Sequence, residues 1–200
     1  MRPIKEKKER SLGVKLFLKA ERCSSPKCVT VRRPQRPGQH GAKRQRNISD
    51  FGKQLQEKQK IRIFFGLNNK QLGKLFETLT KEQIAARLRE RLDFVVYLLG
   101  FAKSPRIARQ LVSHGHIVVN GKKTNIASFH VKKGDVIQVR TESKDSKIFE
   151  GTKEYLKNLE VPKWLTVDIN ELKGECVAPS STEEYQFPFD INLVGQFYSR

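Results

Sequence analysis

The 200-residue sequence has no long apolar run, few cysteines and few acidic residues. Its longest run without a strongly polar residue is 94–102, far short of the ~20 residues that a membrane-spanning helix needs. Three cysteines are an odd number, so a complete disulfide framework is ruled out and a reducing compartment is the default. No apolar segment follows Met1, so we predict no secretory signal and a cytoplasmic protein.

Acidic residues are scarce because basic residues dominate: Lys+Arg number 40 against 21 Asp+Glu, for a net charge of +19. Residues 1–62 hold 19 basic and 5 acidic residues and 63–140 hold 14 and 5, but 141–200 hold 7 and 11. Solubility needs a net charge of only ~2–8 in a small domain. The excess predicts a polyanionic partner for the first 140 residues, with nucleic acid ahead of an anionic membrane surface. The acidic third is expected to close a fold or to contact proteins.

The chain divides into three parts by composition. Residues 1–48 are predicted to be an extended basic N-terminal arm that buries little area and is ordered by its partner, because prolines and glycines in 31–46 disfavour a regular helix. Residues 49–90 predict a small helical domain: Ser49 caps a helix that ends at Gly66, Asn68 or Asn69 caps a second, and a third runs over 81–92. The exposed face of the first helix is expected to be basic, through Lys53, Lys58, Lys60 and Arg62.

The segment 91–140 predicts two helices followed by three short strands. A buried helix over 91–101 precedes a helix over 105–114, which Ser104 caps and Gly115 ends. Strands are expected at 116–120, 122–126 and 136–140, and the Asn120-Gly121 pair is a strong hairpin signal. On the second helix, spacing places Ile107, Ala108, Leu111 and Val112 inward and Arg106, Arg109, Gln110 and Ser113 outward. The fold class is therefore α+β, with two helices packed on a small, mostly antiparallel sheet.

Three stretches in this segment resemble the S4 RNA-binding module: Arg91-Leu92-Asp93, the helix 104–115 and Val119-Asn120-Gly121. Pro37-Gly38-Gln39-His40-Gly41, the stretch 57–60 and the last four residues resemble the bacterial uS4 family of small-subunit ribosomal proteins. That resemblance implies a discontinuous helical domain, 49–90 completed by about 177–200, with the S4 module and its elaboration inserted at 91–176.

The resemblance also implies the function. Members bind 16S rRNA as primary binders that nucleate assembly of the 30S body, lie beside ribosomal protein S5 and affect translational accuracy. They line the mRNA entrance with basic residues that correspond here to Lys43, Arg44 and Arg46, and some repress translation of their own operon. We expect no enzyme activity, no membrane and no small-molecule substrate. The candidate RNA-binding residues are Arg32, Arg33, Arg36, His40, Lys43, Arg44, Arg46, Lys53, Lys58, Lys60, Arg62, Ser104, Arg106, Arg109, Gln110, His114, Lys122, Lys123 and Lys132.

A zinc site is the open question about cofactors. Zinc-binding members of the family carry a Cys-x-x-Cys pair before a second cysteine pair, which corresponds here to Cys23 and Cys28. Glu6 and Glu9 stand where the first pair would be. Structural zinc takes four thiolate or imidazole ligands, and two thiolates alone are not a site, so we predict no metal cofactor. The alternative is zinc at Cys23 and Cys28, with His40 as a third ligand and a carboxylate as a fourth.

Two other functions were weighed against the ribosomal one. An RNA-modifying enzyme would need a catalytic domain, but the last 60 residues contain no histidine, and Asp168 and Asp190 there are isolated carboxylates. A free RNA-binding stress protein would be a lone module with a basic tail, which the helical segment and the acidic third argue against. Trp164 and Cys176, both in the acidic third, are expected to be buried.

Overall fold

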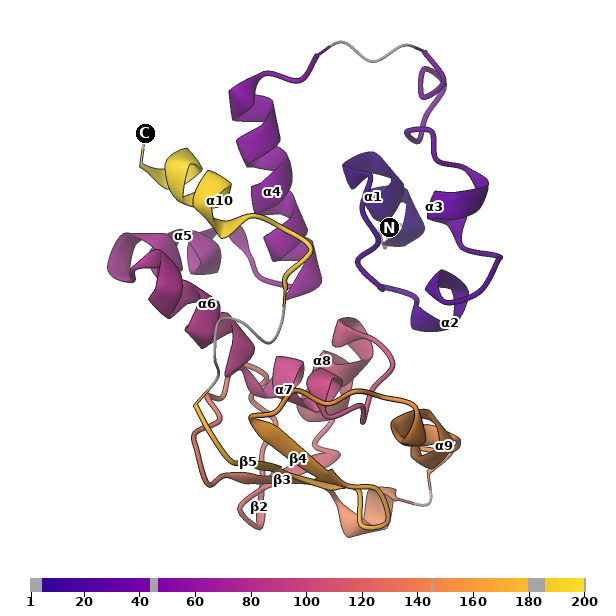
Figure 1. The fold of residues 1–200 in the computed structure, drawn as a ribbon, viewed down its shortest axis with the longest axis vertical. Helices are drawn as coiled ribbons and strands as arrows, with labels where there is room; N and C mark the ends of the chain where they lie inside the picture. Colours follow the sequence, from indigo (N-terminus) through magenta and orange to yellow (C-terminus); the bar gives the residue numbers. More distant parts are fainter. Residues whose placement is uncertain (1–4, 44–46, 145, 180–185, 200) are drawn as a thin grey trace. The chain divides into compact units, whose positions relative to one another are not determined.

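The computed structural model describes residues 5–43, 47–144, 146–179 and 186–199, and it divides into two units (Figure 1). Unit 1 comprises residues 1–81 and 187–200, and unit 2 comprises residues 82–186. Within the described ranges, no helix is both long enough and apolar enough to cross a membrane.

The N-terminal part of unit 1 contains three short helices, α1 (Lys5–Leu12), α2 (Ala20–Cys23) and α3 (Val29–Arg32), and α1 packs against α3. Leu16 is fully buried, and Leu18 and Cys28 are 2% exposed. The prediction that this segment buries little was therefore wrong for residues 16–28. Few apolar residues are present, but they are concentrated where the helices meet.

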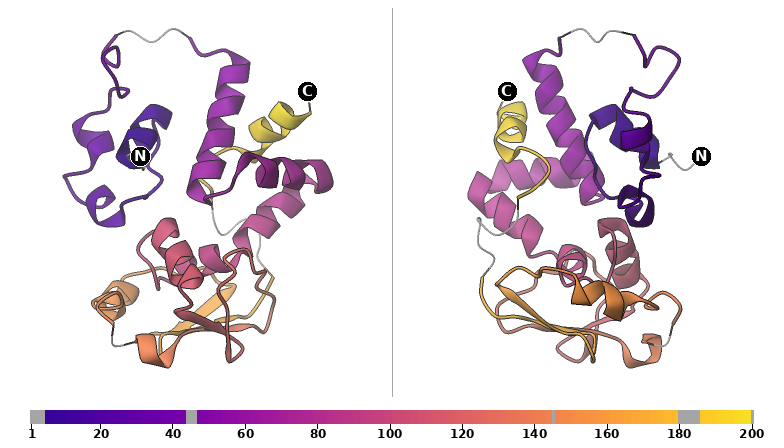
Figure 2. Two further views of the ribbon diagram at one scale, coloured as in Figure 1. Left: turned by 180° about the vertical axis from the view of Figure 1, so that it is seen from behind. Right: turned by 45° about the vertical axis from the view of Figure 1, so that its right-hand side comes forward.

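The rest of unit 1 is a helical cluster in which the C-terminal helix packs against helices from residues 50–78. Helix α4 (Asp50–Phe64) begins where predicted, with the Ser49 hydroxyl accepting the Gly52 N–H at 3.2 Å. Helix α5 (Asn69–Thr78) opens with a capping box between Asn68 and Gln71. Helix α10 (Ile191–Tyr198) packs along α4 and also contacts α5 (Figure 2). The contacts are aromatic, with ring centroids 5.5 Å apart in the Phe51–Phe197 pair and 5.1 Å apart in the Phe76–Tyr198 pair.

The predicted helix over 81–92 is divided in the structure, so that expectation was wrong at its end. Helix α6 (Lys81–Arg89) stops and α7 (Leu92–Leu98) starts three residues later. Between them Arg91 forms a β-bridge with His130, and the Leu92 N–H donates to the Phe129 carbonyl at 2.8 Å. Pairing with a distant segment has overridden the helical periodicity.

Unit 2 is built on a five-stranded antiparallel sheet of order β2-β1-β3-β5-β4. Its strands are β1 (Ile117–Val119), β2 (Lys122–Lys123), β3 (Val136–Val139), β4 (Leu165–Asp168) and β5 (Lys173–Cys176). Helix α8 (Pro105–Ser113) precedes the sheet, and η1 (Thr141–Ser143) and α9 (Thr152–Lys157) lie between β3 and β4. The α+β class is confirmed, and the three predicted strands are present but shorter than expected.

Helices α7 and α8 cover one face of the sheet (Figures 1 and 2). The side chains of Ile137 and Val139 are fully buried. Gly174 in β5 allows α7 to approach closely, because a Cβ there would lie 2.5 Å from a methyl carbon of Leu99. Trp164 and Cys176 are each 2% exposed, so their predicted burial is confirmed.

Candidate nucleic-acid interface

Helix α8 is the most regular basic element of unit 2. The Ser104 hydroxyl accepts the Ile107 N–H at 3.2 Å, and Pro105 occupies the first turn. Ala108, Leu111 and Val112 are buried as predicted, but Ile107 is 39% exposed, so its predicted inward position was wrong. Ser104 is fully buried, so its side chain starts the helix and does not present a group to a partner. The outward side chains on α8 and its C-cap are Arg106, Gln110 and His114, with Arg109 half-exposed.

A buried carboxylate fixes the base of this surface. Asp93 is 4% exposed, and its two oxygens accept from Arg91 Nε at 3.0 Å and Nη2 at 2.8 Å. Its Oδ2 also lies 3.6 Å from Nη1 of Arg109. Because Arg109 is held at one end by a buried anion, its guanidinium is oriented before any partner arrives.

Lys123 of β2 joins this helix at its C-terminal end. Gly115 has φ of +74°, and a Cβ there would lie 2.3 Å from Cε of Lys123. The end of the lysine side chain therefore lies against the backbone of Gly115, the residue after the C-cap of α8. A cation is electrostatically favoured beside a helix C-terminus.

The β1–β2 hairpin and the turn before β3 carry two further exposed lysines, Lys122 and Lys132. Asn120 and Gly121 have positive φ of 49° and 76°, as a type I′ turn requires. The Asn120 amide donates to Asp135 Oδ1 at 2.7 Å, and Asp135 Oδ2 accepts the Lys132 N–H at 2.7 Å. These bonds hold the turn before β3 against the hairpin. We call the resulting set the α8 surface, made of Arg106, Arg109, Gln110, His114, Lys122, Lys123 and Lys132.

Helix α4 differs from the prediction of an exposed basic face. Lys58 is half-buried with its ammonium 4.2 Å from the Phe197 ring centroid, and burial and the neighbouring Arg62 lower its pKa. The Lys60 side chain is only 12% exposed and pairs with Glu57 at 2.5 Å, while Arg62 donates to Asn69 at 3.2 Å. Of the four cations, Lys53 alone is fully exposed. Packing of α10 on this helix, which the sequence pattern did not reveal, accounts for the difference.

The N-terminal segment contains a basic cavity that sequence reasoning missed. Its volume is about 500 Å³, and its charged lining consists of Glu6 and the cations Lys7, Arg10, Arg22, Arg32 and Arg33. The side chain of Arg10 is fixed by bonds to the carbonyls of Arg33, at 2.9 Å, and Gln35, at 2.8 Å. The i,i+3 spacing of Lys7 and Arg10 was the available signal.

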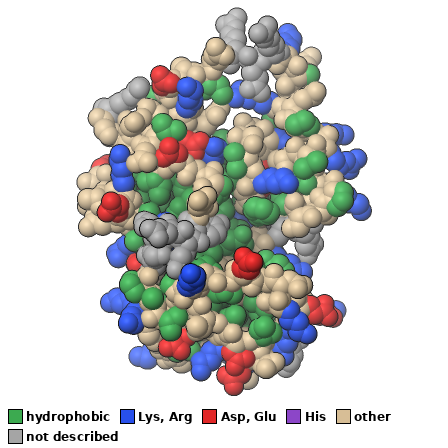
Figure 3. All heavy atoms as spheres, viewed as in Figure 1, with side chains coloured by type: hydrophobic (Ala, Val, Ile, Leu, Met, Phe, Trp, Pro, Cys, Tyr) green, Lys and Arg blue, Asp and Glu red, His purple; other side chains and the backbone are tan. Residues whose placement is uncertain are grey.

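The remaining predicted residues of this segment are open to solvent. Arg32, Arg33, His40 and Lys43 are exposed and Arg36 is half-buried, whereas Arg44 and Arg46 lie outside the described residues. Figure 3 shows Lys and Arg side chains at the surface of both units.

The residues around Cys23 and Cys28 do not fit a structural zinc ion. Within the described ranges, no three His, Cys, Asp or Glu side chains gather in a metal-binding arrangement. Burial and the nearby Glu9 carboxylate raise the pKa of Cys23 to about 11, which opposes the thiolate that zinc requires. Cys28 Sγ instead lies 2.9 Å from the Thr30 hydroxyl.

Comparison with known proteins gives consistent matches along the chain. A model of the S4 domain matches residues 90–137, and a model described as the ribosomal protein S4/S9 N-terminal domain matches residues 2–92. The "Small ribosomal subunit protein uS4" of Thermus thermophilus is 44% identical over 194 residues, which cover 94% of this chain and 93% of that protein. Proteins of the same name from Acetivibrio thermocellus and Halothermothrix orenii are 44% and 42% identical over the same shares.

Proposed function

The chain belongs to the uS4 family of small ribosomal subunit proteins, and from this premise we propose that it is a primary binder of 16S rRNA that nucleates assembly of the 30S body. As a family member it is a structural constituent of the small ribosomal subunit in the cytoplasm, it binds rRNA there, and it is not an enzyme. The predicted RNA-binding and translation roles are confirmed at this level.

The observation that carries the finer proposal is the preorganised α8 surface. In A-form RNA the bases are hidden in a deep groove, so a protein recognises the fold through phosphates and 2′-hydroxyls. Arg109 is held by the buried Asp93, so this cation loses less entropy on binding than a free side chain would. A rigid basic surface of this kind suits a folded RNA junction.

The N-terminal cavity extends the proposed contact area. Lys7, Arg10 and Arg22 join Arg32 and Arg33 around a space large enough for a phosphate group, and Arg10 is already fixed by backbone carbonyls. We assign RNA phosphates to this cavity. Lys43, with Arg44 and Arg46, is proposed to line the mRNA entrance, and ribosomal protein S5 is the proposed protein neighbour. Repression of its own mRNA would use the same basic surfaces.

Salt dependence of binding tests the α8 surface. The double variant Arg106→Gln, Lys123→Gln should bind a 16S rRNA fragment more weakly, and its slope of log affinity against log salt should fall by about 1–2, because each lost phosphate contact removes ~0.7–0.9. Lys157→Gln, which removes an exposed cation from α9, is the matched control and should bind like the wild type. An unchanged slope in the double variant would show that the α8 surface does not contact the RNA.

The entrance assignment has its own test. Ribosomes carrying glutamine at positions 43, 44 and 46 should assemble normally but translate more slowly through a stable mRNA hairpin. Equal loss of assembly and of passage through the hairpin would contradict the assignment and place these residues in rRNA binding.

A further inference from the structure

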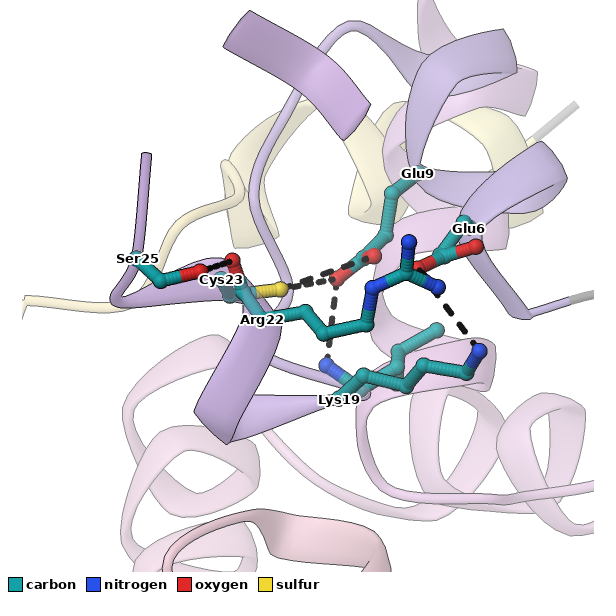
Figure 4. Close-up of polar contacts among 7 residues, drawn as sticks. Glu6, Glu9, Lys19, Arg22, Cys23 and Ser25 are labelled. Carbon is teal, nitrogen blue, oxygen red and sulfur yellow. Dashed lines mark hydrogen bonds and ion pairs between the residues drawn. The ribbon is translucent and has the colours of Figure 1, made fainter. Parts of the chain in front are cut away.

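Glu9 is a deeply buried acidic residue of the N-terminal segment, at 1% exposure, and it lies at the centre of several contacts (Figure 4). Its Oε1 accepts the backbone N–H of Leu16 at 3.0 Å and that of Leu18 at 3.1 Å. The Cys23 thiol lies 3.9 Å from each carboxylate oxygen. One side chain on α1 therefore gathers donors from the irregular stretch that follows it and from α2.

The hydrogen bonds to Glu9 matter because the amides that donate them belong to buried residues. Leu16 is fully buried and Leu18 is 2% exposed, so water is a poor substitute acceptor for their amides. A buried N–H without an acceptor costs as much as a lost hydrogen bond, and a buried carboxylate is tolerated only where donors surround it. Carboxylate and amides thus need one another, and their hydrogen bonds are strengthened by the charge.

Glu6 supplies a second, weaker link, one turn before Glu9 on α1. Its carboxylate lies 2.9 Å from Nη1 of Arg22 and 3.6 Å from Nζ of Lys19. The Arg22 side chain is 49% exposed, so solvent screens this pair. The two carboxylates together connect α1 to residues 16–23, with Glu9 as the buried connection and Glu6 as the peripheral one.

We propose that the Glu9 carboxylate is the cross-link around which residues 5–33 fold, and that this segment holds its structure without a metal ion. A structural metal joins separated pieces of a small segment by collecting their donor atoms at one point, and Glu9 collects two amides and a thiol in the same way. The anion binds N–H and S–H groups, whereas a metal would need lone pairs and a deprotonated thiol. Cys23 therefore cannot bind the Glu9 carboxylate through its S–H group and a metal ion through its thiolate at the same time.

Hydrogen exchange in the full-length protein tests the proposal. Glu9→Gln keeps the size of the side chain but removes its charge and turns one acceptor into a donor. The Leu16 and Leu18 amides should then exchange at least tenfold faster than in the wild type. Glu6→Gln, the matched control, should change them less than threefold. Unchanged protection in Glu9→Gln would overturn the proposal.

Metal dependence gives an independent measurement that does not need a variant to fold. Protection of the same two amides in the wild type should be the same with a strong chelator and with added Zn²⁺, and the purified protein should contain far less than one zinc per chain. Stoichiometric zinc, or protection that falls on chelation, would overturn the proposal. The double variant Glu6→Cys, Glu9→Cys should lose protection without metal and should regain it with Zn²⁺. Failure to regain it would show that the carboxylates do not occupy a cross-linking position.

Discussion

In unit 2 two helices and a sheet bury a continuous set of apolar side chains, whereas in residues 5–33 a buried carboxylate on α1 accepts hydrogen bonds from Leu16, Leu18 and Cys23. Phe94, Val95 and Val96 on α7 are all at most 1% exposed, which gives unit 2 a core of ordinary density. The N-terminal segment has too few apolar residues for such a core. The difference shows how a strongly basic segment can be ordered: a central anion satisfies buried donors that apolar packing would leave unpaired.

The largest expected effect separates the two regions directly. Phe94→Ala removes a ring that is 1% exposed, and the free energy of unfolding of unit 2 should fall by about 3–5 kcal/mol. Denaturant unfolding followed by hydrogen exchange should show loss of protection in β1 and β3 but not at Leu16 or Leu18. Ile148→Ala, at a 52% exposed position, should cost less than about 0.5 kcal/mol. Parallel loss in both regions would mean that they are not held independently.

Substitution of Asp93 tests whether a buried carboxylate is also a cross-link in unit 2, whose core is apolar. Asp93→Ala leaves the Arg91 guanidinium, whose side chain is 9% exposed, without its buried anion. Removing one partner of a buried pair costs about 3–5 kcal/mol, so unit 2 should be destabilised by about that amount. Asp50→Ala, which removes a carboxylate that is 84% exposed, should change stability by less than about 0.5 kcal/mol in the same unfolding experiment. Equal effects would show that burial is irrelevant to these ion pairs.

The pH dependence of unit 2 should contain a contribution from His130. Burial, with Arg87 and then Arg91 nearby, lowers its pKa to about 4 from the ordinary 6.5. Between about pH 6.5 and pH 4 the unfolded chain binds a proton that the folded chain does not, so stability falls as pH falls through this window. The loss should be on the order of 1–2 kcal/mol, measured as the difference between the wild type and His130→Gln across that range. Identical pH profiles would place His130 in an ordinary environment.

The smallest effect concerns Lys58 in unit 1. Lys58→Met keeps an unbranched apolar side chain but removes the cation above the rings of Phe197 and Tyr198, and it should cost about 0.5–1 kcal/mol in the unfolding of α4. Lys53→Met, at an exposed position on the same helix, is the comparison and should be near neutral. No difference in stability between the two variants would mean that Lys58 does not stabilise the fold and that its role is limited to rRNA binding.

Local signals predicted the elements that carry their own caps and turns. Ser49, Asn68 and Ser104 cap helices as expected, and Asn120-Gly121 makes the hairpin. Strands β4 and β5 were missed, and β5 contains a glycine, which sequence rules read as unfavourable in a strand. The glycine in β5, Gly174, is explained by the close approach of the Leu99 side chain, which is distant in the sequence.

Prediction of the site failed where tertiary contacts decide exposure. Sequence spacing identified Arg106 and Gln110 as outward and Ser104 as a cap, but it could not show that Ser104 is fully buried or that Lys60 pairs with Glu57. The i,i+3 spacing of Lys7 and Arg10 was a signal for the cavity near α1, but its cations are spread over residues 7–33, so the sequence did not show that they line one space. The net positive charge predicted a polyanionic partner, whereas the folded structure decides which cations are exposed to it.

The packing of α10 on α4 has a consequence for the order in which the protein can form during synthesis. Unit 2 is one continuous stretch, so all of it is synthesised before α10 is made. Unit 1 needs residues from both sides of that stretch, and the rings of Phe197 and Tyr198 reach Phe51 and Phe76 only at the end. The helical unit is begun first and completed last, and until then its aromatic side chains remain without their final covering.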